Sequence, residues 1–215
     1  MKKNDFIILC LLIICSYFVP SIANADTPHQ VLDKTAGILK NSDGIQATFE
    51  VTSYKGASIS GNTSGTIYVR GNKFKITSQQ MTTWFDGKTQ WALMAGSDEV
   101  YASTPTADEL QSINPYTFVN LYKSGYNAQM TITNYNNKSC YEVRLLAQQK
   151  GRSIREMRII IDKTSYWPLS IRMKQKDGNW IRIRVGNTSS GKKWKDSFFQ
   201  FSKKDYPSVE IIDLR

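Results

Sequence analysis

From residue 45 to the C-terminus, apolar and polar residues alternate with a period of two in one short segment after another. In LSIRMK (169–174) and WIRIRV (180–185), aliphatic residues alternate with residues that are mostly basic. A period of two is typical of strands with one buried face and one solvated face. The pattern therefore predicts a sheet with an aliphatic face and a cationic face. We interpret most of the net charge of +10 as solvated exterior, with an anion-binding patch as the alternative.

Short turns separate these segments, so neighbouring strands are expected to pair antiparallel. Asp86 and Gly87 form the clearest hairpin-turn signal. Repeats and linkers are missing from the sequence, which favours a single domain. The predicted strands are 45–54, 64–72, 73–79, 82–85, 89–95, 99–104, 126–135, 139–148, 153–162, 168–176, 179–187, 194–201 and 209–213.

Helical signals occur in two places. Residues 28–40 have the 3.6-residue period of an amphipathic helix. Its apolar face would hold Val31, Leu32, Thr35, Ile38 and Leu39. In 106–123, Thr106 and Glu109 have the spacing of a capping box, and Pro115 is placed to start a second short helix. The chain is thus expected to be mainly β with a few helices.

The N-terminus predicts export. Residues 1–25 combine two lysines, an apolar run and an A-x-A motif, as in a cleaved bacterial signal peptide. The run is about 14 residues long, whereas a membrane-spanning helix needs roughly 20. Cys10 and Cys15 lack the small preceding residue of a lipidation site, and Cys140 is then the only cysteine left. We expect an unlipidated, soluble periplasmic domain, residues 26–215, without a disulfide.

Candidate catalytic groups are few. His29 is the only histidine, so a Ser-His-Asp, Cys-His or His-rich metal site is not expected. Asp98 and Glu99 are adjacent and would point to opposite faces of a strand. The segment 186–193 resembles a phosphate-binding loop, but a strand follows it where a helix is required. We predict no enzyme activity, no cofactor and no metal, with Cys140 as a core residue.

Two further classes fit poorly. An outer-membrane barrel would place basic residues in the lipid, at roughly 2–4 kcal/mol each. A nucleic-acid partner is the least suitable explanation of the charge for an exported chain.

If the alternation holds, large apolar residues gather on one face of the sheet and its helical cover. Either they fill a core, or they line a cavity for a small apolar body. The candidates are Phe49, Val51, Ile67, Val69, Phe74, Ile76, Trp91, Leu93, Phe118, Leu121, Met157, Ile159, Ile161, Leu169, Ile171, Met173, Ile181 and Ile183.

Several segments, in this order and spacing, resemble the LolA family of periplasmic lipoprotein carriers. The six segments are FEV (49–51), GTIYVRGNKFKI (65–76), FDGKTQWAL (85–93), EVY (99–101), NPYTFVNLY (114–122) and FFQFSKKDYPSVEIIDLR (198–215). The resemblance runs through almost all of 26–215, and its most specific parts are the second and third of these segments.

The resemblance implies an incomplete, half-open antiparallel barrel covered by the N-terminal helix and a helical lid. Its cavity would hold the acyl chains of lipoproteins, received from an inner-membrane ABC-type releasing complex and passed to an outer-membrane acceptor. The carrier would act as a monomer, without nucleic acid or cofactor. Arg70 matches the arginine that ties the lid shut in the family, although Gly71 replaces the proline common there.

Other functions remain open at this point. A carrier of glycolipid or another envelope lipid would need the same cavity. A lipid-sensing regulatory module of this fold would normally carry a further domain after Arg215, and the outer-membrane acceptor would itself be lipidated. An enzyme would require an Asp, Glu or Cys140 with a strongly shifted pKa inside the cavity.

Overall fold

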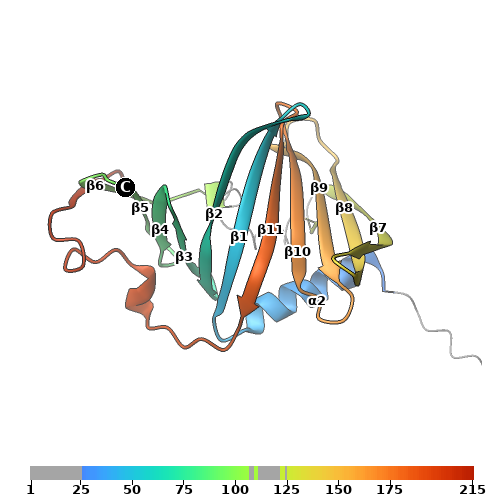
Figure 1. Ribbon diagram of the computed structural model, residues 1–215, viewed down its shortest axis with the longest axis horizontal. Helices are drawn as coiled ribbons and strands as arrows, with labels where there is room; N and C mark the ends of the chain where they lie inside the picture. The colour runs from blue at the N-terminus through green and yellow to red at the C-terminus, as the bar shows by residue number, and fades with distance from the viewer. Residues whose placement is uncertain (1–25, 107–108, 111–121, 124) are drawn as a thin grey trace, which may run out of the picture.

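A computed structural model describes residues 26–106, 109–110, 122–123 and 125–215 of the protein (Figure 1). Its main feature is one twelve-stranded sheet with the strand order β12-β6-β5-β4-β3-β2-β1-β11-β10-β9-β8-β7. Neighbours pair antiparallel except β12 and β6, which pair parallel. The strands are β1 (Ile45–Lys55), β2 (Ser58–Arg70), β3 (Lys73–Ser78), β4 (Met81–Phe85), β5 (Gln90–Met94), β6 (Glu99–Ser103), β7 (Tyr126–Tyr135), β8 (Lys138–Ala147), β9 (Ile154–Asp162), β10 (Pro168–Gln175), β11 (Trp180–Ser189) and β12 (Glu210–Asp213).

The sheet curves but does not close (Figure 1). Its edge strands are β7 and β12, which do not pair with each other in the part of the chain that the structure describes. The barrel expected from the family resemblance is therefore an open sheet with a concave and a convex face. Antiparallel pairing and the mainly β composition are as predicted.

One predicted strand is wrong. Residues 194–201 contain the short 3-10 helix η2 (Asp196–Phe199) instead of a strand. The aromatic residues of this segment do not pair with the sheet. Trp194 and Phe198 pack edge-on against Tyr68, which lies on the convex face. The spacing of these aromatic residues therefore reflects their packing onto the convex face of the sheet.

The N-terminal helix α2 (Pro28–Asn41) agrees with the sequence prediction. The Thr27 side chain accepts a hydrogen bond from the Gln30 backbone, and the Gln30 side chain accepts one from the Thr27 backbone, which completes a capping box. The helix packs against the sheet's concave face, where its apolar side forms the main core with β1–β3 and β8–β10. The buried residues of α2 are Val31, Leu32, Thr35 and Leu39.

Polar contacts of Asp26 hold the start of α2 to Lys34 in the helix and to Tyr166 between β9 and β10. Asp26 accepts hydrogen bonds from Lys34 at 2.7 Å and from the Tyr166 hydroxyl at 2.7 Å. These contacts hold the pKa of the Asp26 carboxyl below its usual range, chiefly through Lys34. The helix is thereby fixed at one end of the concave face.

The predicted lid falls mostly on residues that the structure does not describe. Its first turn is present, since the Glu109 backbone donates to Thr106 and the Glu109 carboxylate accepts from the Thr106 backbone at 2.7 Å. The predicted capping box is thus confirmed. Within the described ranges, no helix is long and apolar enough to cross a membrane.

Candidate functional site: an apolar trough

The part of the concave face that α2 leaves uncovered forms a cavity of about 490 Å³, which we call the trough. It crosses seven adjacent strands, from β10 through β11, β1, β2, β3 and β4 to β5. It is lined by Ala47, Phe49, Val51, Thr63, Ile67, Ile76, Ser78, Gln80, Met81, Thr83, Met94, Pro168, Ile171, Met173, Ile181, Ile183 and Val185.

Strand geometry gives the trough its size. Along β1 the lining runs from Ala47 to Val51, or about 13 Å at roughly 3.3 Å per residue. Across the sheet, seven strands at roughly 4.8 Å spacing give an arc of about 29 Å. The cavity volume lies in the range of about 300–1,000 Å³ that is usual for small-molecule sites. A long, flexible apolar group fits these proportions better than a compact one.

A glycine on β2 shapes the floor of the trough. Gly65 pairs directly with Phe49 on β1, and a Cβ added at Gly65 would lie 2.8 Å from the Phe49 ring. The same Cβ would also collide with the carbonyl oxygen of Thr77. Glycine here lets the phenyl ring lie down against the neighbouring strand. The glycine at the start of GTIYVRGNKFKI therefore has a packing reason.

The lining is apolar, only partly covered and uncharged. Phe49, Val51, Ile181 and Ile183 are half-buried, although they lie in the middle of the sheet. Threonine, serine and glutamine hydroxyl and amide groups supply the polar part, and none of the lining residues is ionisable. The described lining therefore suits the binding of an apolar body.

Eight of the sequence-predicted residues line the trough, and they come from β1, β2, β3, β10 and β11. This grouping depends on the period of two, which places every second residue of a strand on the same face. The eight are Phe49, Val51, Ile67, Ile76, Ile171, Met173, Ile181 and Ile183.

Five others lie on the same face but belong to the core under α2 and do not line the trough. They are sealed because the helix and neighbouring strands cover that end of the sheet. These are Val69, Phe74, Met157, Ile159 and Ile161, all at 5% exposure or less.

Trp91 and Leu93 do not face the trough, contrary to the sequence interpretation. The trough residue Ile76 stands opposite Thr83, which in turn stands opposite Ala92. The side chains of 91 and 93 therefore point to the other, convex face. There they pack in a second apolar cluster with Trp84.

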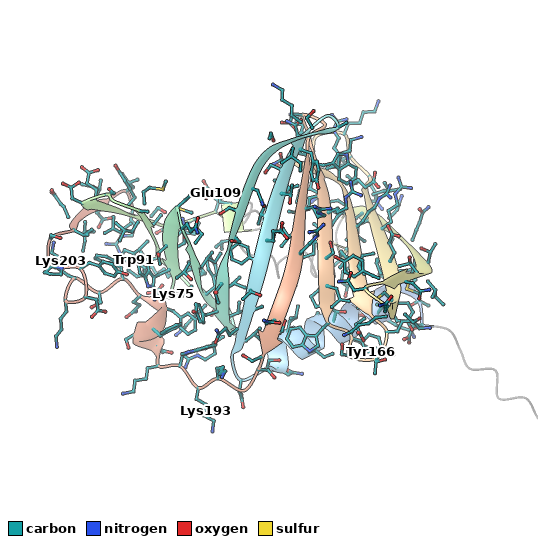
Figure 2. All side chains as sticks on the ribbon, viewed as in Figure 1. Lys75, Trp91, Glu109, Tyr166, Lys193 and Lys203 are labelled. Atoms are coloured by element: carbon teal, nitrogen blue, oxygen red, sulfur yellow. The ribbon has the colours of Figure 1, made fainter. Side chains whose placement is uncertain are left out.

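The C-terminal segment, residues 190–215, covers this second cluster. Phe201 and Tyr206 each lie edge-on to the Trp84 ring, with centroids 5.7 Å apart. Val209 completes the cluster, and β12 then pairs with β6. Figure 2 shows Trp91 and Lys75 on the side of the sheet along which this segment runs. The tryptophans of 81–101 thus belong to a core on the convex face.

Leu169 is displaced by a bulge. Pro168 stands opposite Ile161, and Ile171 stands opposite Ile159, so three steps on β10 match two on β9. Pro168 therefore takes the trough position that the simple alternation gave to Leu169. Two further candidates, Phe118 and Leu121, lie outside the described residues.

Arg70 forms a hydrogen bond and an ion pair with the C-terminal segment. Its guanidinium donates to the Trp194 carbonyl oxygen and forms an ion pair with Asp196. It also lies 5.5 Å from the Phe199 ring centroid. Because Arg70 follows Val69, its side chain points to the convex face, away from the trough. These contacts differ from the lid closure expected for this arginine.

The sequence interpretation missed several lining residues. Ala47 and Val185 have the same strand parity as Phe49 and Ile183, so the period of two could have found them. The β4 and β5 residues were missed because the parity of that hairpin was assigned the wrong way round. The missed residues are Ala47, Thr63, Ser78, Gln80, Met81, Thr83, Met94, Pro168 and Val185.

The two candidate reactive groups lie elsewhere. Cys140 is fully buried, and burial raises the pKa of its thiol, which favours the neutral form. His29, on α2, packs edge-on against Tyr122. Among the described residues, no group of three or more His, Cys, Asp or Glu side chains could hold a metal ion.

A comparison with protein-family models assigns the sequence. Residues 19–177 match the model described as "Outer membrane lipoprotein carrier protein LolA". The chain belongs to the LolA family. The match covers the strands from β1 to β10, and the sheet continues beyond it with β11 and β12. No curated protein gives a significant match to this LolA-family chain.

Three solved structures are similar to this chain. An uncharacterised conserved protein from Thermus thermophilus is 11% identical, with a TM-score of 0.58 over 86% of this chain and 97% of that one. A LolA superfamily protein from Nitrosomonas europaea is 10% identical, with a TM-score of 0.43 over 85% and 100% of the two chains. A putative outer-membrane lipoprotein-sorting domain from Vibrio parahaemolyticus is 12% identical, with a TM-score of 0.44 over 82% and 97%.

Proposed function

We propose that this protein is a periplasmic carrier that holds the acyl chains of lipoproteins in the trough and moves them from the inner to the outer membrane. The observation that carries the proposal is the trough itself, a broad apolar surface in mid-sheet that α2 leaves uncovered and whose described lining residues include no ionisable group. The family assignment supports the choice of ligand.

The energetics favour partial cover of the acyl chains. Each methylene moved from water to the trough gains about 0.8 kcal/mol. Two or three long chains would therefore exceed the ceiling of about 18–21 kcal/mol for noncovalent affinity if every methylene were buried. An open trough holds only part of the chains, so the cargo can be released to a second apolar site. Transfer then follows differential affinity and requires no chemical step.

Two lining methionines suit a variable ligand. Met81 and Met94 stand opposite each other on β4 and β5 and are 37% and 50% exposed. Methionine side chains are flexible and polarisable, so they adapt to chains of different shape. We infer that this edge of the trough accommodates differences between cargo lipoproteins.

The remaining parts of the proposal concern the route. We infer that residues 1–25 are a cleaved signal peptide and that 26–215 act as one domain in the periplasm. The proposed partners are acylated lipoproteins, an inner-membrane ABC-type releasing complex and an outer-membrane acceptor. The protein would act without enzyme activity or cofactor.

The test is native mass spectrometry of residues 26–215, purified from periplasm without detergent and incubated with inner-membrane vesicles that carry a tagged lipoprotein. The expected result is a 1:1 complex with triacylated lipoprotein and none with its unacylated form. Capture of phospholipid or glycolipid without lipoprotein would move the function to lipid transport. An empty protein in both cases would contradict the carrier function.

A matched pair of variants links the result to the trough. Ile183→Asp places a carboxylate among the half-buried lining residues and should abolish the complex. Ile211→Asp makes the same change at a 45% exposed position on β12 and should leave the complex intact. Equal loss of the complex in both variants would show that lipoprotein capture does not depend on the trough.

A further inference from the structure

Four arginines form a row across the convex face, and we call them the arginine row. Arg144, Arg158, Arg172 and Arg182 stand directly opposite one another on β8, β9, β10 and β11. Each alternates with residues of the concave face, so the row lies on the other side of the sheet from the trough. With strands roughly 4.8 Å apart, the row is about 14 Å long.

Like charges directly opposite each other destabilise a sheet, so the row needs counter-charges. Glu156 supplies one, because its carboxylate accepts hydrogen bonds of 2.8 Å from both Arg144 and Arg158. Arg172 and Arg182 have no carboxylate partner among the described residues. The Nε of Arg182 is buried and has no hydrogen-bond partner in that part of the chain either. Two of the four arginines therefore lack a counter-charge among the described residues.

Aromatic rings lie between these cations. Trp180 has the Arg172 guanidinium 5.1 Å and the Lys174 ammonium 5.8 Å from its ring centroid. On the neighbouring strand, Tyr54 stands opposite Trp180 and has Arg182 at 5.5 Å. Amphipathic aromatic rings beside basic groups are typical of the boundary between a membrane and water.

Three hairpin turns lie together at the end of the sheet next to the row (Figure 1). Gln175 stands opposite Ile154, which brings the β8–β9 and β10–β11 turns to the same end, beside the β1–β2 turn. Exposed lysines at 55, 150 and 176 lie in or next to these turns, and nitrogen-tipped side chains project there (Figure 2). Asp177 is the one acidic residue in the three turns. Ile59, beside the first turn, is 66% exposed.

We propose that the arginine row and these hairpin turns dock the protein on a membrane surface rich in anionic phospholipid. Guanidinium groups bind phosphate oxygens bidentately, and surface lysines add attraction to a negative membrane. The exposed Ile59 and the Trp180 ring supply the apolar and interfacial contacts that a membrane uses and that a purely acidic protein surface would leave unused. The proposal does not depend on what the trough binds.

Docking in this way has a consequence for the trough. Arg182 and the lining residues Ile181 and Ile183 are neighbours on β11 and point to opposite faces. A membrane in contact with the convex face would thus lie one sheet thickness from the trough wall. The membrane would hold the protein at its surface on the side of the sheet opposite the trough.

The test is co-sedimentation of residues 26–215 with vesicles of phosphatidylethanolamine and phosphatidylglycerol, and with neutral phosphatidylcholine vesicles. We expect binding to the anionic vesicles that weakens as salt is raised from low ionic strength, and no binding to the neutral ones. Arg172→Gln/Arg182→Gln should lower the partition coefficient roughly 25-fold, from about fivefold per basic residue. Arg172→Lys/Arg182→Lys should recover most of it.

The matched control removes the same charge elsewhere. Lys192→Gln/Lys193→Gln changes two exposed lysines beyond the other end of β11, where Figure 2 labels Lys193. At roughly 3.3 Å per residue along β11, they lie about 30 Å or more from Trp180. That distance exceeds the screening length of about 8 Å, so binding should change little. Equal loss in both variants, or wild-type protein that ignores anionic vesicles, overturns the proposal. Circular dichroism and lipoprotein capture, measured in parallel, separate these results from misfolding and from the trough's function.

Discussion

The trough and the cluster under the C-terminal segment are both apolar faces of the same curved sheet, yet only one is closed. On the convex face, Trp84 and Val100 are 2% and 0% exposed because Phe201 and Tyr206 lie over them. In the trough, side chains of comparable size remain half-buried because no described segment covers them. Among the described residues, the C-terminal segment seals one apolar face and no segment covers the trough on the other.

This difference separates a core from a binding surface in physical terms. Burial of an apolar side chain against its own chain stabilises the folded state. An uncovered apolar side chain gains this free energy of burial only when a ligand covers it. Substitutions in the sealed cluster should therefore act on stability. Substitutions in the trough should act on binding.

The largest effect is expected for Trp84→Ala. This change removes the ring on which Phe201 and Tyr206 pack, and it should lower the free energy of unfolding by about 3–5 kcal/mol. Urea denaturation followed by circular dichroism measures the loss. Met94→Ala, at a 50% exposed position in the trough, is the control and should lose less than about 1 kcal/mol. A loss at Trp84 no larger than at Met94 would mean that the C-terminal segment does not seal the cluster.

A smaller effect is expected for Arg70→Leu. The arginine holds the C-terminal segment through the Trp194 carbonyl and Asp196, so its loss should cost about 1–2 kcal/mol and expose residues 194–209 to proteases. Hydrogen exchange in that segment gives a local measurement. Arg184→Leu breaks an exposed ion pair with Glu50 and should cost less than about 1 kcal/mol. Unchanged exchange in 194–209 would show that Arg70 does not hold the segment.

The sequence predicted the fold well where local pattern decides it. Alternation located the strands, and the parity of 169–174 and 180–185 placed Ile171, Met173, Ile181 and Ile183 on the trough face. Within a strand, parity is fixed by backbone geometry alone. The capping box of Thr106 and Glu109 and the Asp86-Gly87 turn are likewise local, and Gly87 has the positive φ of 102° that the turn requires.

Long-range packing accounts for what the sequence could not predict. Trp91 and Leu93 alternate like trough residues, but residues more than 100 positions later cover them on the other face. Alternation shows that a face avoids water and does not show what covers it. A single bulge shifted Leu169, and η2 replaced a predicted strand because its aromatic residues pack on the sheet. Arg70 likewise lies beside distant residues that no local pattern reveals.

Three isoleucines on neighbouring strands should differ in their effects on stability and binding. Ile159 stands opposite Ile171, which stands opposite Ile183, so the row runs from the core under α2 into the trough. Ile159 is fully buried, and Ile159→Ala should cost about 2–5 kcal/mol. Ile183→Ala should cost about 1 kcal/mol or less but weaken binding of a fluorescent fatty acid severalfold. Equal losses of stability at both ends of the row would indicate that the trough is closed in solution.

The smallest expected effect is a response of the C-terminal segment to pH, which the trough should not share. Burial alone would raise the pKa of the Asp86 carboxyl, but donation from the Thr89 and Lys88 backbones and from the Gln200 side chain outweighs it and holds the pKa below its usual range. A lowered pKa contributes stability above the unfolded-state pKa, and that stability is lost as pH falls through the folded value. Acid should therefore loosen the C-terminal segment at Gln200.

The trough should not respond in this way, because its lining contains no ionisable group. The protection factors of the amides near Gln200, which correct for the intrinsic pH dependence of exchange, should fall between pH 6 and acid pH. The affinity for an uncharged lipid probe should change little. Asp86→Asn keeps an acceptor for Gln200 but cannot titrate, so it should remove the local acid response. If the affinity for the uncharged probe fell with the attachment of the C-terminal segment, the two faces would be coupled, and the seal on one side of the sheet would set the shape of the trough on the other.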